Sequence, residues 1–315
     1  MALNRVLVTC PPMLGMLDDF VDTAQNLGIE LIPVEVTQTL SESELIALLP
    51  DFDGWIIGDD PATRRVFEAG KRGSLKAAVK WGIGTDNVDF KVCENLGIPI
   101  TNTPGMFGGE VADIAVGYVI ALARHTMEID RGVRNGGWPK PCGLSLAGRK
   151  VAVVGYGDIG RNTARRLLAA DMNVIAYDPF VDANSLEDDV CLATWPEKLG
   201  EADFVVVNCA LTKSSHHLLN FSAFEAMKYG VRVVNVGRGP VIDESALIAS
   251  LASGKVHSAA LDVFEEEPLS LDSPLRTHES CIFGSHNASN TVDGVKRTSF
   301  KAIELLAEFL CELTI

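Results

Sequence analysis

The sequence predicts an α/β protein made of two units, each with a parallel sheet covered by helices on both faces. Short apolar runs alternate with amphipathic stretches along almost the whole chain. Gly28 and Gly97 each follow a helical run and precede a strand-like run, as glycines do where helices end. The length of 315 residues exceeds that of one usual core, so we expect two domains.

The first series of elements extends to residue 102. Apolar runs predict strands at 6–9, 29–34, 54–57, 77–80 and 98–101. Helical periodicity lies between them, for example at 43–49 and 89–96. Strands that alternate with helices in this way favour a parallel sheet with helices on both faces.

A second series begins after residue 148. Strands are predicted at 150–155, 173–177, 204–208, 231–236, 258–262 and 281–284, and helices at 159–170 and 243–253. Longer helical patterns occupy 110–125 and 291–313. We therefore expect residues 103–287 to form a domain inserted between 1–102 and 288–315, with an arm at about 107–148.

Composition excludes several classes of protein. Lys and Arg total 27 against 42 Asp and Glu, the net charge is −15, and no run of cations occurs. We therefore expect neither nucleic acid nor a membrane surface as partner. The N-terminus lacks a signal-peptide pattern, which predicts a cytoplasmic protein. Seven scattered cysteines without a C-x-x-C pair predict reduced thiols and no structural metal site.

A glycine-rich turn follows the strand predicted at 150–155. It consists of Gly155, Tyr156, Gly157, Asp158, Ile159 and Gly160, which fit G-x-G-x-x-G. The first glycine allows a tight turn, the second lets the backbone approach a pyrophosphate, and the third lets the helix pack closely. The helix N-terminus adds free N–H groups and a positive dipole end. We expect these residues to bind a dinucleotide.

An acid at the end of the next predicted strand indicates which dinucleotide. Asp178 stands 23 positions after Gly155, close to the spacing expected for a ribose-binding carboxylate. Its charge would repel a 2′-phosphate. The sequence therefore favours NAD (NADH) over NADP.

Three further segments place polar residues in apolar surroundings. Arg238 stands between two glycines after the strand predicted at 231–236. Residues 262–268 read DVFEEEP, and His286 lies among small polar residues. Strand ends of a parallel sheet face the ligand crevice, and an imidazole titrates near neutral pH as acid–base chemistry requires.

Several segments now carry a family resemblance. They are GIGTDNVD at 82–89, NTPG at 102–105, EVAD at 110–113, GYGDIGR at 155–161, NVGRG at 235–239, DVFEEEP at 262–268 and His286. In this order they resemble the D-isomer-specific 2-hydroxyacid dehydrogenases, nearest to the phosphoglycerate dehydrogenases and hydroxypyruvate/glyoxylate reductases. The resemblance implies a Rossmann NAD domain inserted into a smaller flavodoxin-like substrate domain. It also implies a homodimer formed through the arm.

The resemblance implies a role for each matching residue. Arg238 binds the substrate carboxylate and polarises the carbonyl, Glu267 pairs with the catalytic histidine, and His286 gives or takes the proton. Asp262 holds the nicotinamide carboxamide. Further cofactor contacts fall on Ile83, Cys209, Val236 and Gly237.

Substrate binding is expected at the turn that follows the strand predicted at 77–80. The residues implied are Lys80, Trp81, Gly82, Ile83 and Gly84, together with Arg238 and His286. Lys80 stands where many phosphoglycerate enzymes have Arg, so it is open whether it binds a phosphate or a carboxylate. Gly284 and Ser285 stand where many members have Pro before the histidine. Both departures leave open which small anionic 2-keto or 2-hydroxy acid is used.

The predicted function is hydride transfer between NAD(H) and C2 of such an acid. An alternative is a non-catalytic NAD-sensing protein of the corepressor kind, since such relatives can retain the catalytic residues. A formate-type dehydrogenase would have Gln at position 267, so Glu267 argues against that class.

Overall fold

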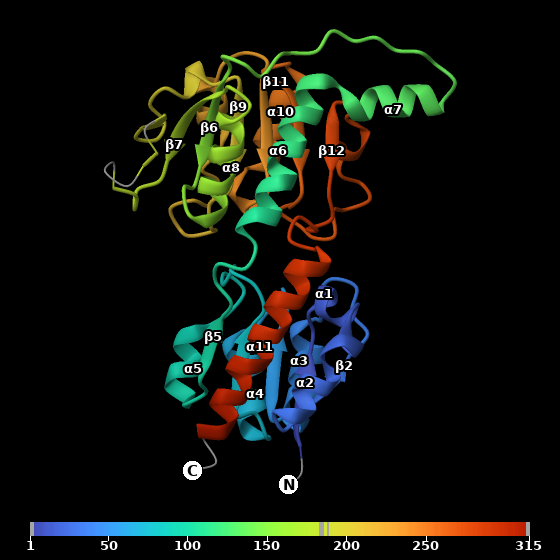
Figure 1. Ribbon diagram of the computed structural model, residues 1–315, viewed down its shortest axis with the longest axis vertical. Helices are drawn as coiled ribbons and strands as arrows, with labels where there is room; N and C mark the ends of the chain where they lie inside the picture. The colour runs from blue at the N-terminus through green and yellow to red at the C-terminus, as the bar shows by residue number, and fades with distance from the viewer. Residues whose placement is uncertain (1–2, 183–185, 188, 313–315) are drawn as a thin grey trace. The chain divides into compact units, whose positions relative to one another are not determined.

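The computed structural model describes residues 3–182, 186–187 and 189–312, which form two compact units (Figure 1). Unit 1 comprises Met1–Phe107 and Asn290–Ile315, and unit 2 comprises Gly108–Ser289. The borders fall five and two residues later than those predicted at 103 and 288. Residues 103–107 belong to unit 1 because the Thr103 hydroxyl accepts a hydrogen bond from Gly82 N at 2.7 Å.

The sheet of unit 1 is parallel throughout, as predicted. Its order is β2-β1-β3-β4-β5, so the chain winds outward in both directions from a switch point between β1 and β3. The strands are β1 (Asn4–Val8), β2 (Ile29–Pro33), β3 (Gly54–Ile57), β4 (Ala77–Lys80) and β5 (Ile100–Asn102).

Helices flank this sheet, and three of them lie where the sequence predicts helical patterns, at 43–49, 89–96 and 291–313. They are α1 (Pro11–Leu14), α2 (Val21–Asn26), α3 (Glu42–Leu48), α4 (Arg64–Arg72), α5 (Phe90–Leu96) and α11 (Val292–Glu312). Ser41 and Glu44 form a capping box at the start of α3. The last helix, α11, packs on β3 and β4 (Figure 1). A Cβ at Gly54 would lie 3.1 Å from Leu306, so glycine lets this helix come close.

The sheet of unit 2 is also parallel, as predicted. Its order is β12-β11-β10-β9-β6-β7-β8, with the switch point between β6 and β9. The strands are β6 (Lys150–Val154), β7 (Asn173–Tyr177), β8 (Val190–Leu192), β9 (Phe204–Val207), β10 (Val231–Asn235), β11 (Val256–Leu261) and β12 (Cys281–Phe283). The short edge strand β8 was not among the predicted elements.

The described residues of unit 2 include α-helices. They are α6 (Gly108–Arg124), α7 (Thr126–Arg134), α8 (Asp158–Leu168), α9 (Phe221–Ala226) and α10 (Glu244–Ala252). Helix α6 packs on α8 (Figure 1). In the described part of the chain, no helix has both the length and the apolar character needed to cross a bilayer.

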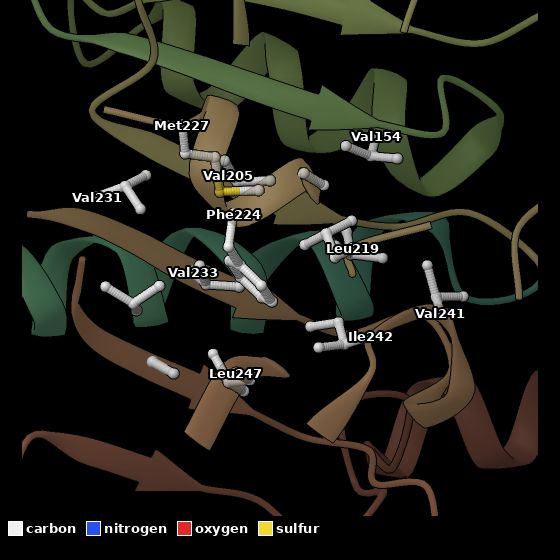
Figure 2. Packing of buried hydrophobic residues seen from close by; sticks show 14 of the residues in the cluster. Val154, Val205, Leu219, Phe224, Met227, Val231, Val233, Val241, Ile242 and Leu247 are labelled. Carbon is white, nitrogen blue, oxygen red and sulfur yellow. The ribbon is translucent and has the colours of Figure 1, made fainter. Parts of the chain in front are cut away.

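The core of unit 2 lies between its sheet and helices α9 and α10. Figure 2 shows Val205 of β9 and Val233 of β10 together with Phe224 of α9 and Leu247 of α10. All four side chains are almost completely buried. Burying such side chains holds the strand ends in place, and the loops at those ends carry the polar residues described next.

Candidate functional site

The glycine turn between β6 and α8 has the geometry expected of a dinucleotide-binding turn. Gly155 has a φ of 88°, and a Cβ there would lie 2.6 Å from the Cys209 backbone. A Cβ at Gly160 would overlap the Gly155 carbonyl oxygen, so only glycine lets α8 start so close to the turn. At Gly157, no described heavy atom lies within 4 Å of such a Cβ. The turn is therefore tight on one side and open at its second glycine.

The other side chains of the turn are directed away from it. Tyr156 is buried and its hydroxyl donates to Glu187. Burial, together with that bond, raises the pKa of the Tyr156 phenol, which therefore stays a donor. Ile159 is partly buried and Asp158 is exposed, with its carboxylate against Gly108 at the start of α6. This leaves the backbone of the turn accessible to a phosphate.

Asp178 follows β7 and is fixed by backbone donors. Its Oδ2 accepts a hydrogen bond from Tyr156 N at 2.8 Å, and its Oδ1 accepts one from Phe180 N at 2.9 Å. The carboxylate is thus tied to the second residue of the glycine turn. This is the place that the spacing predicts for a group that binds ribose hydroxyls.

Asn208 is a polar residue at the same edge that sequence reasoning missed. It follows β9, and its backbone N donates to Val154 O at 2.8 Å across the switch point. Its amide oxygen and nitrogen are both buried, and neither has a hydrogen-bond partner among the described residues. A buried amide without a partner is costly unless a ligand or water satisfies it. The sequence feature that could have indicated Asn208 is an asparagine at the end of a predicted apolar strand.

The next residues of this edge are Cys209 and, after β10, Val236 and Gly237. A Cβ at Gly237 would lie 2.8 Å from Cys209 O, so the two segments are in close contact. Burial, and then the charge of Asp178, raise the pKa of the Cys209 thiol to about 11. With the open Gly157 and the Asn208 amide, these residues fit a bound dinucleotide, its pyrophosphate at the N-terminus of α8.

A histidine–carboxylate pair lies in the loops that follow β11 and β12. His286 Nδ1 is 2.7 Å from Glu267 Oε2, and each side chain is 21% exposed. Glu267 Oε1 accepts a hydrogen bond from Phe264 N at 2.9 Å, which orients the carboxylate. His286 N donates to Asp262 O at 2.7 Å, and His286 has a φ of 56°. The imidazole is therefore held through both its backbone and its Nδ1.

Asp262 shapes the loop that carries His286. Its buried carboxylate accepts hydrogen bonds from Asn287 N at 3.2 Å and Ala288 N at 2.9 Å. A Cβ at Gly284 would overlap Asp262 Oδ1 and lie 2.7 Å from the Tyr118 hydroxyl. Glycine at position 284 is thus required by the close packing of this loop. The contacts of Asp262 add a positioning role to the carboxamide contact that the resemblance implies.

Arg238 is presented by a loop that Asn235 organises. Asn235 Oδ1 accepts a hydrogen bond from Gly237 N, and its Nδ2 donates to Arg238 O, both at 3.0 Å. A Cβ at Gly239 would overlap Phe264 O, so glycine lets this loop pack against the segment that orients Glu267. Asn235 is almost fully buried at the end of β10. It belongs to the NVGRG segment, but no role was predicted for it.

The predicted substrate turn of unit 1 contains a buried cation. Lys80 Nζ donates to Gly58 O at 2.7 Å, to Asp59 Oδ1 at 3.1 Å and to Trp81 O at 3.1 Å. Its side chain is 3% exposed. An ammonium group has three protons, and these three acceptors take all of them. In this structure Lys80 thus binds acceptors of the protein itself, and its predicted contact with substrate stays a prediction.

The rest of this turn divides into a packed part and an open part. Trp81 is buried, donates from Nε1 to Ser299 Oγ at 3.1 Å and packs on Phe107. Gly82 has a φ of 107° and donates to Thr103. Ile83 is 45% exposed, and no described residue accepts a hydrogen bond from the N–H of Ile83 or Gly84. Two consecutive amides are thus available to an anion.

Known proteins similar to this chain agree with the geometry. Residues 116–288 match the family described as D-isomer specific 2-hydroxyacid dehydrogenase, NAD binding domain. A hydroxypyruvate reductase of Thermotoga maritima is 35% identical over 278 residues, which cover 86% of this chain and 89% of the relative. A D-3-phosphoglycerate dehydrogenase of Archaeoglobus fulgidus is 35% identical over 291 residues, 91% of this chain but only 54% of that longer relative.

Solved structures extend the similarity to the whole fold. The apo-structure of D-lactate dehydrogenase from Escherichia coli matches with a TM-score of 0.83 at 26% identity, covering 98% of this chain and 97% of the other. A glyoxylate reductase from Paecilomyes thermophila matches with a TM-score of 0.82 at 26% identity, covering 96% and 94%. The chain therefore belongs to the D-isomer-specific 2-hydroxyacid dehydrogenase family, whose NAD-binding domain it contains.

Proposed function

We propose that this chain transfers a hydride between NAD(H) and C2 of a small anionic 2-keto or D-2-hydroxy acid. The observation that supports this most strongly is the His286–Glu267 pair at 2.7 Å. It lies in the unit that also holds Arg238 and the glycine turn, and all of these follow carboxyl ends of strands of one sheet. The relatives include enzymes named for phosphoglycerate, hydroxypyruvate and glyoxylate.

The proposed chemistry divides the work among three side chains. NADH, when bound, supplies the hydride that C2 of the keto acid receives. Negative charge then develops on the carbonyl oxygen, where Arg238 stabilises it and protonated His286 donates a proton from Nε2. Glu267 occupies Nδ1, so it orients the ring and leaves proton transfer to Nε2. The product is the 2-hydroxy acid, and oxidation follows the same steps in reverse.

A turn of unit 1 offers backbone donors that suit a carboxylate. The N–H groups of Ile83 and Gly84 suit a carboxylate because both belong to one turn after β4. For the cofactor, Asp178 supports NAD over NADP because a 2′-phosphate would meet its negative charge.

The test is NADH oxidation by the purified protein with glyoxylate, hydroxypyruvate and 3-phosphohydroxypyruvate. We expect turnover with at least one of these acids and none with NADPH at the same concentration. The alternative, an NAD-sensing protein without activity, predicts NADH binding by fluorescence but no oxidation with any acid. That result would overturn the proposal.

The same proposal includes a cytoplasmic homodimer. Exposed apolar side chains occur on α6, on α7 and in the arm. They are Ile114, Ile120, Met127, Val133 and Trp138. Trp138 is 77% exposed, and such clusters are typical of association surfaces. All seven cysteines are free thiols, which suits a reducing compartment. Light scattering that gives the mass of one chain would contradict the dimer.

A further inference from the structure

We propose that Lys80 is a positioning residue that ties two loops of unit 1 together, and that this enzyme prefers 2-keto acids without a phosphate group. The inference rests on the proposed function and narrows its substrate class. It starts from the three hydrogen bonds that consume the Lys80 ammonium protons.

The two tied loops lie at the carboxyl edge of the sheet, next to its switch point. Gly58 and Asp59 follow β3, and Trp81 follows β4. Lys80 Nζ bridges the carbonyl oxygens of Gly58 and Trp81, at 2.7 and 3.1 Å. Ligands of parallel sheets bind at this edge. The bridge therefore fixes the strand end from which the Ile83 and Gly84 amides extend.

A second layer of hydrogen bonds supports the loop after β3. Asn87 Nδ2 donates to Gly58 O at 3.1 Å and to Asp60 O at 2.7 Å. The buried Asp60 carboxylate accepts from Leu40 N at 2.8 Å, from Gly58 N at 3.2 Å and from the Thr9 hydroxyl. Lys80 is thus one member of a buried polar network, and its place is set by that network without a ligand.

The charges at this edge disfavour a dianion. Asp59 Oδ1 lies 3.1 Å from Lys80 Nζ, so the only cation of the turn is already paired with a carboxylate. The first cations after the Gly58–Asp59 loop are also paired, Arg64 with Glu68 at 3.7 Å and Arg65 with Glu42 at 2.7 Å. A phosphate brought to Lys80 would meet the Asp59 charge and would have to break existing bonds. Two neutral amides, by contrast, suffice for one carboxylate.

The first test compares hydroxypyruvate with 3-phosphohydroxypyruvate, which share a carbon skeleton and differ in the phosphate. We expect kcat/KM of the wild-type chain to be about tenfold or more higher for hydroxypyruvate. A preference for the phosphorylated acid overturns the inference and leaves the proposed function standing. If neither these acids nor glyoxylate is reduced, it is the proposed function that fails.

The second test replaces Lys80 and uses a matched control. In Lys80→Met combined with Asp59→Asn, which leaves no uncompensated charge, we expect kcat/KM to fall by the same factor for both substrates, leaving their ratio unchanged within about twofold. If Lys80 were a phosphate ligand, the variant would instead lose activity selectively toward the phosphorylated acid. The control is Lys76→Met, which removes a lysine–aspartate pair just before β4, at the opposite end of that strand, and should change neither value.

Asp59→Asn alone keeps the inference testable if the double variant does not fold. The neutral side chain leaves the Lys80 charge without its carboxylate partner but keeps the two carbonyl acceptors. We expect kcat/KM for 3-phosphohydroxypyruvate to rise several-fold relative to that for hydroxypyruvate. An unchanged ratio would show that Asp59 does not select against the phosphate and would contradict the proposal.

Discussion

The charged and polar groups at the carboxyl edges of the two sheets differ in their burial and in their hydrogen bonding. At the edge of unit 1, Lys80 is almost fully buried and gives all three protons to unit 1. At the edge of unit 2, His286 and Glu267 each keep 21% of the side chain exposed, and the Asn208 amide has no partner among the described residues.

The difference follows from what each group must do. A buried charge is stable only when it is paired and hydrogen-bonded, and such a group serves to position its neighbours. A general acid must reach its substrate, so part of the side chain has to remain accessible. Under the proposed function, unit 1 thus holds backbone donors in place, while unit 2 holds groups that bind ligand and transfer a proton.

His286→Ala is expected to have the largest effect on activity. We expect kcat to fall by about 10²–10⁴-fold because the proton donor is lost, while the Kd for NADH stays within about twofold. Steady-state kinetics and fluorescence titration measure the two values. The control is His257→Ala, at the opposite end of β11. An active His286→Ala enzyme would remove the basis for assigning chemistry to unit 2.

A smaller effect is expected from Glu267→Gln. The amide keeps a similar shape and an acceptor for Phe264 N, but it loses the charge that supports protonated His286. We expect kcat to fall by about 10- to 100-fold with little change in KM. Glu266→Gln, the exposed neighbour, is the matched control. Equal losses in both variants would indicate a general effect of charge on this loop.

Asn208→Ala tests the unpartnered amide of unit 2. We expect the Kd for NADH to rise about tenfold, which corresponds to the loss of one good hydrogen bond. Calorimetry measures this Kd. The melting temperature of the ligand-free protein should not fall, because no hydrogen bond within the described residues is lost. Asn173→Ala, at the start of β7, is the control. Unchanged NADH affinity with reduced stability would place the amide in the packing of the fold instead.

The smallest effect concerns Asp203, at the amino edge of the unit 2 sheet. Burial alone would raise its pKa, but Lys228 at 2.6 Å, Lys150 N at 3.0 Å and Arg149 at 3.2 Å lower it below the ordinary value. A lowered folded-state pKa contributes stability that is full above the unfolded value of about 3.9 and is lost as pH falls through the folded value.

Asp203→Asn should therefore cost about 1 kcal/mol at pH 7 and progressively less below about pH 5. Urea unfolding at pH 7, 5 and 3 measures this change. A cost that is the same at all three pH values would show that the charge of Asp203 is unimportant and that only its shape matters.

Much of the fold was predictable from apolar runs. The strands predicted at 54–57, 77–80 and 173–177 have the observed bounds of β3, β4 and β7. Each consists mostly of apolar residues. By contrast, β8 is three residues long at a sheet edge, where little burial marks it in the sequence. Edge strands of this length carry too weak a pattern to be distinguished from a loop.

The sequence predicted which residues belong to the candidate site better than it predicted which residues contact one another. The resemblance implied a pairing of His286 with Glu267, which the structure places in contact. The contacts of Lys80 could not be predicted from the sequence, because its acceptors Gly58 and Asp59 follow a different strand. Which strand end lies beside which depends on register and sheet order. The need for Gly284 was invisible for the same reason, because the atoms that exclude a side chain there belong to Asp262 and Tyr118.

The insertion of unit 2 into unit 1 has a consequence for the order of folding during synthesis. Trp81 donates to Ser299, 218 positions later in the chain, and α11 packs on β3 and β4. A ribosome delivers all of Gly108–Ser289 before that helix exists. We therefore expect the core of unit 2 to form first, while the faces of β3 and β4 that α11 covers remain exposed. Contacts of such long sequence separation form slowly, so unit 1 is the part most exposed to misfolding in the nascent chain.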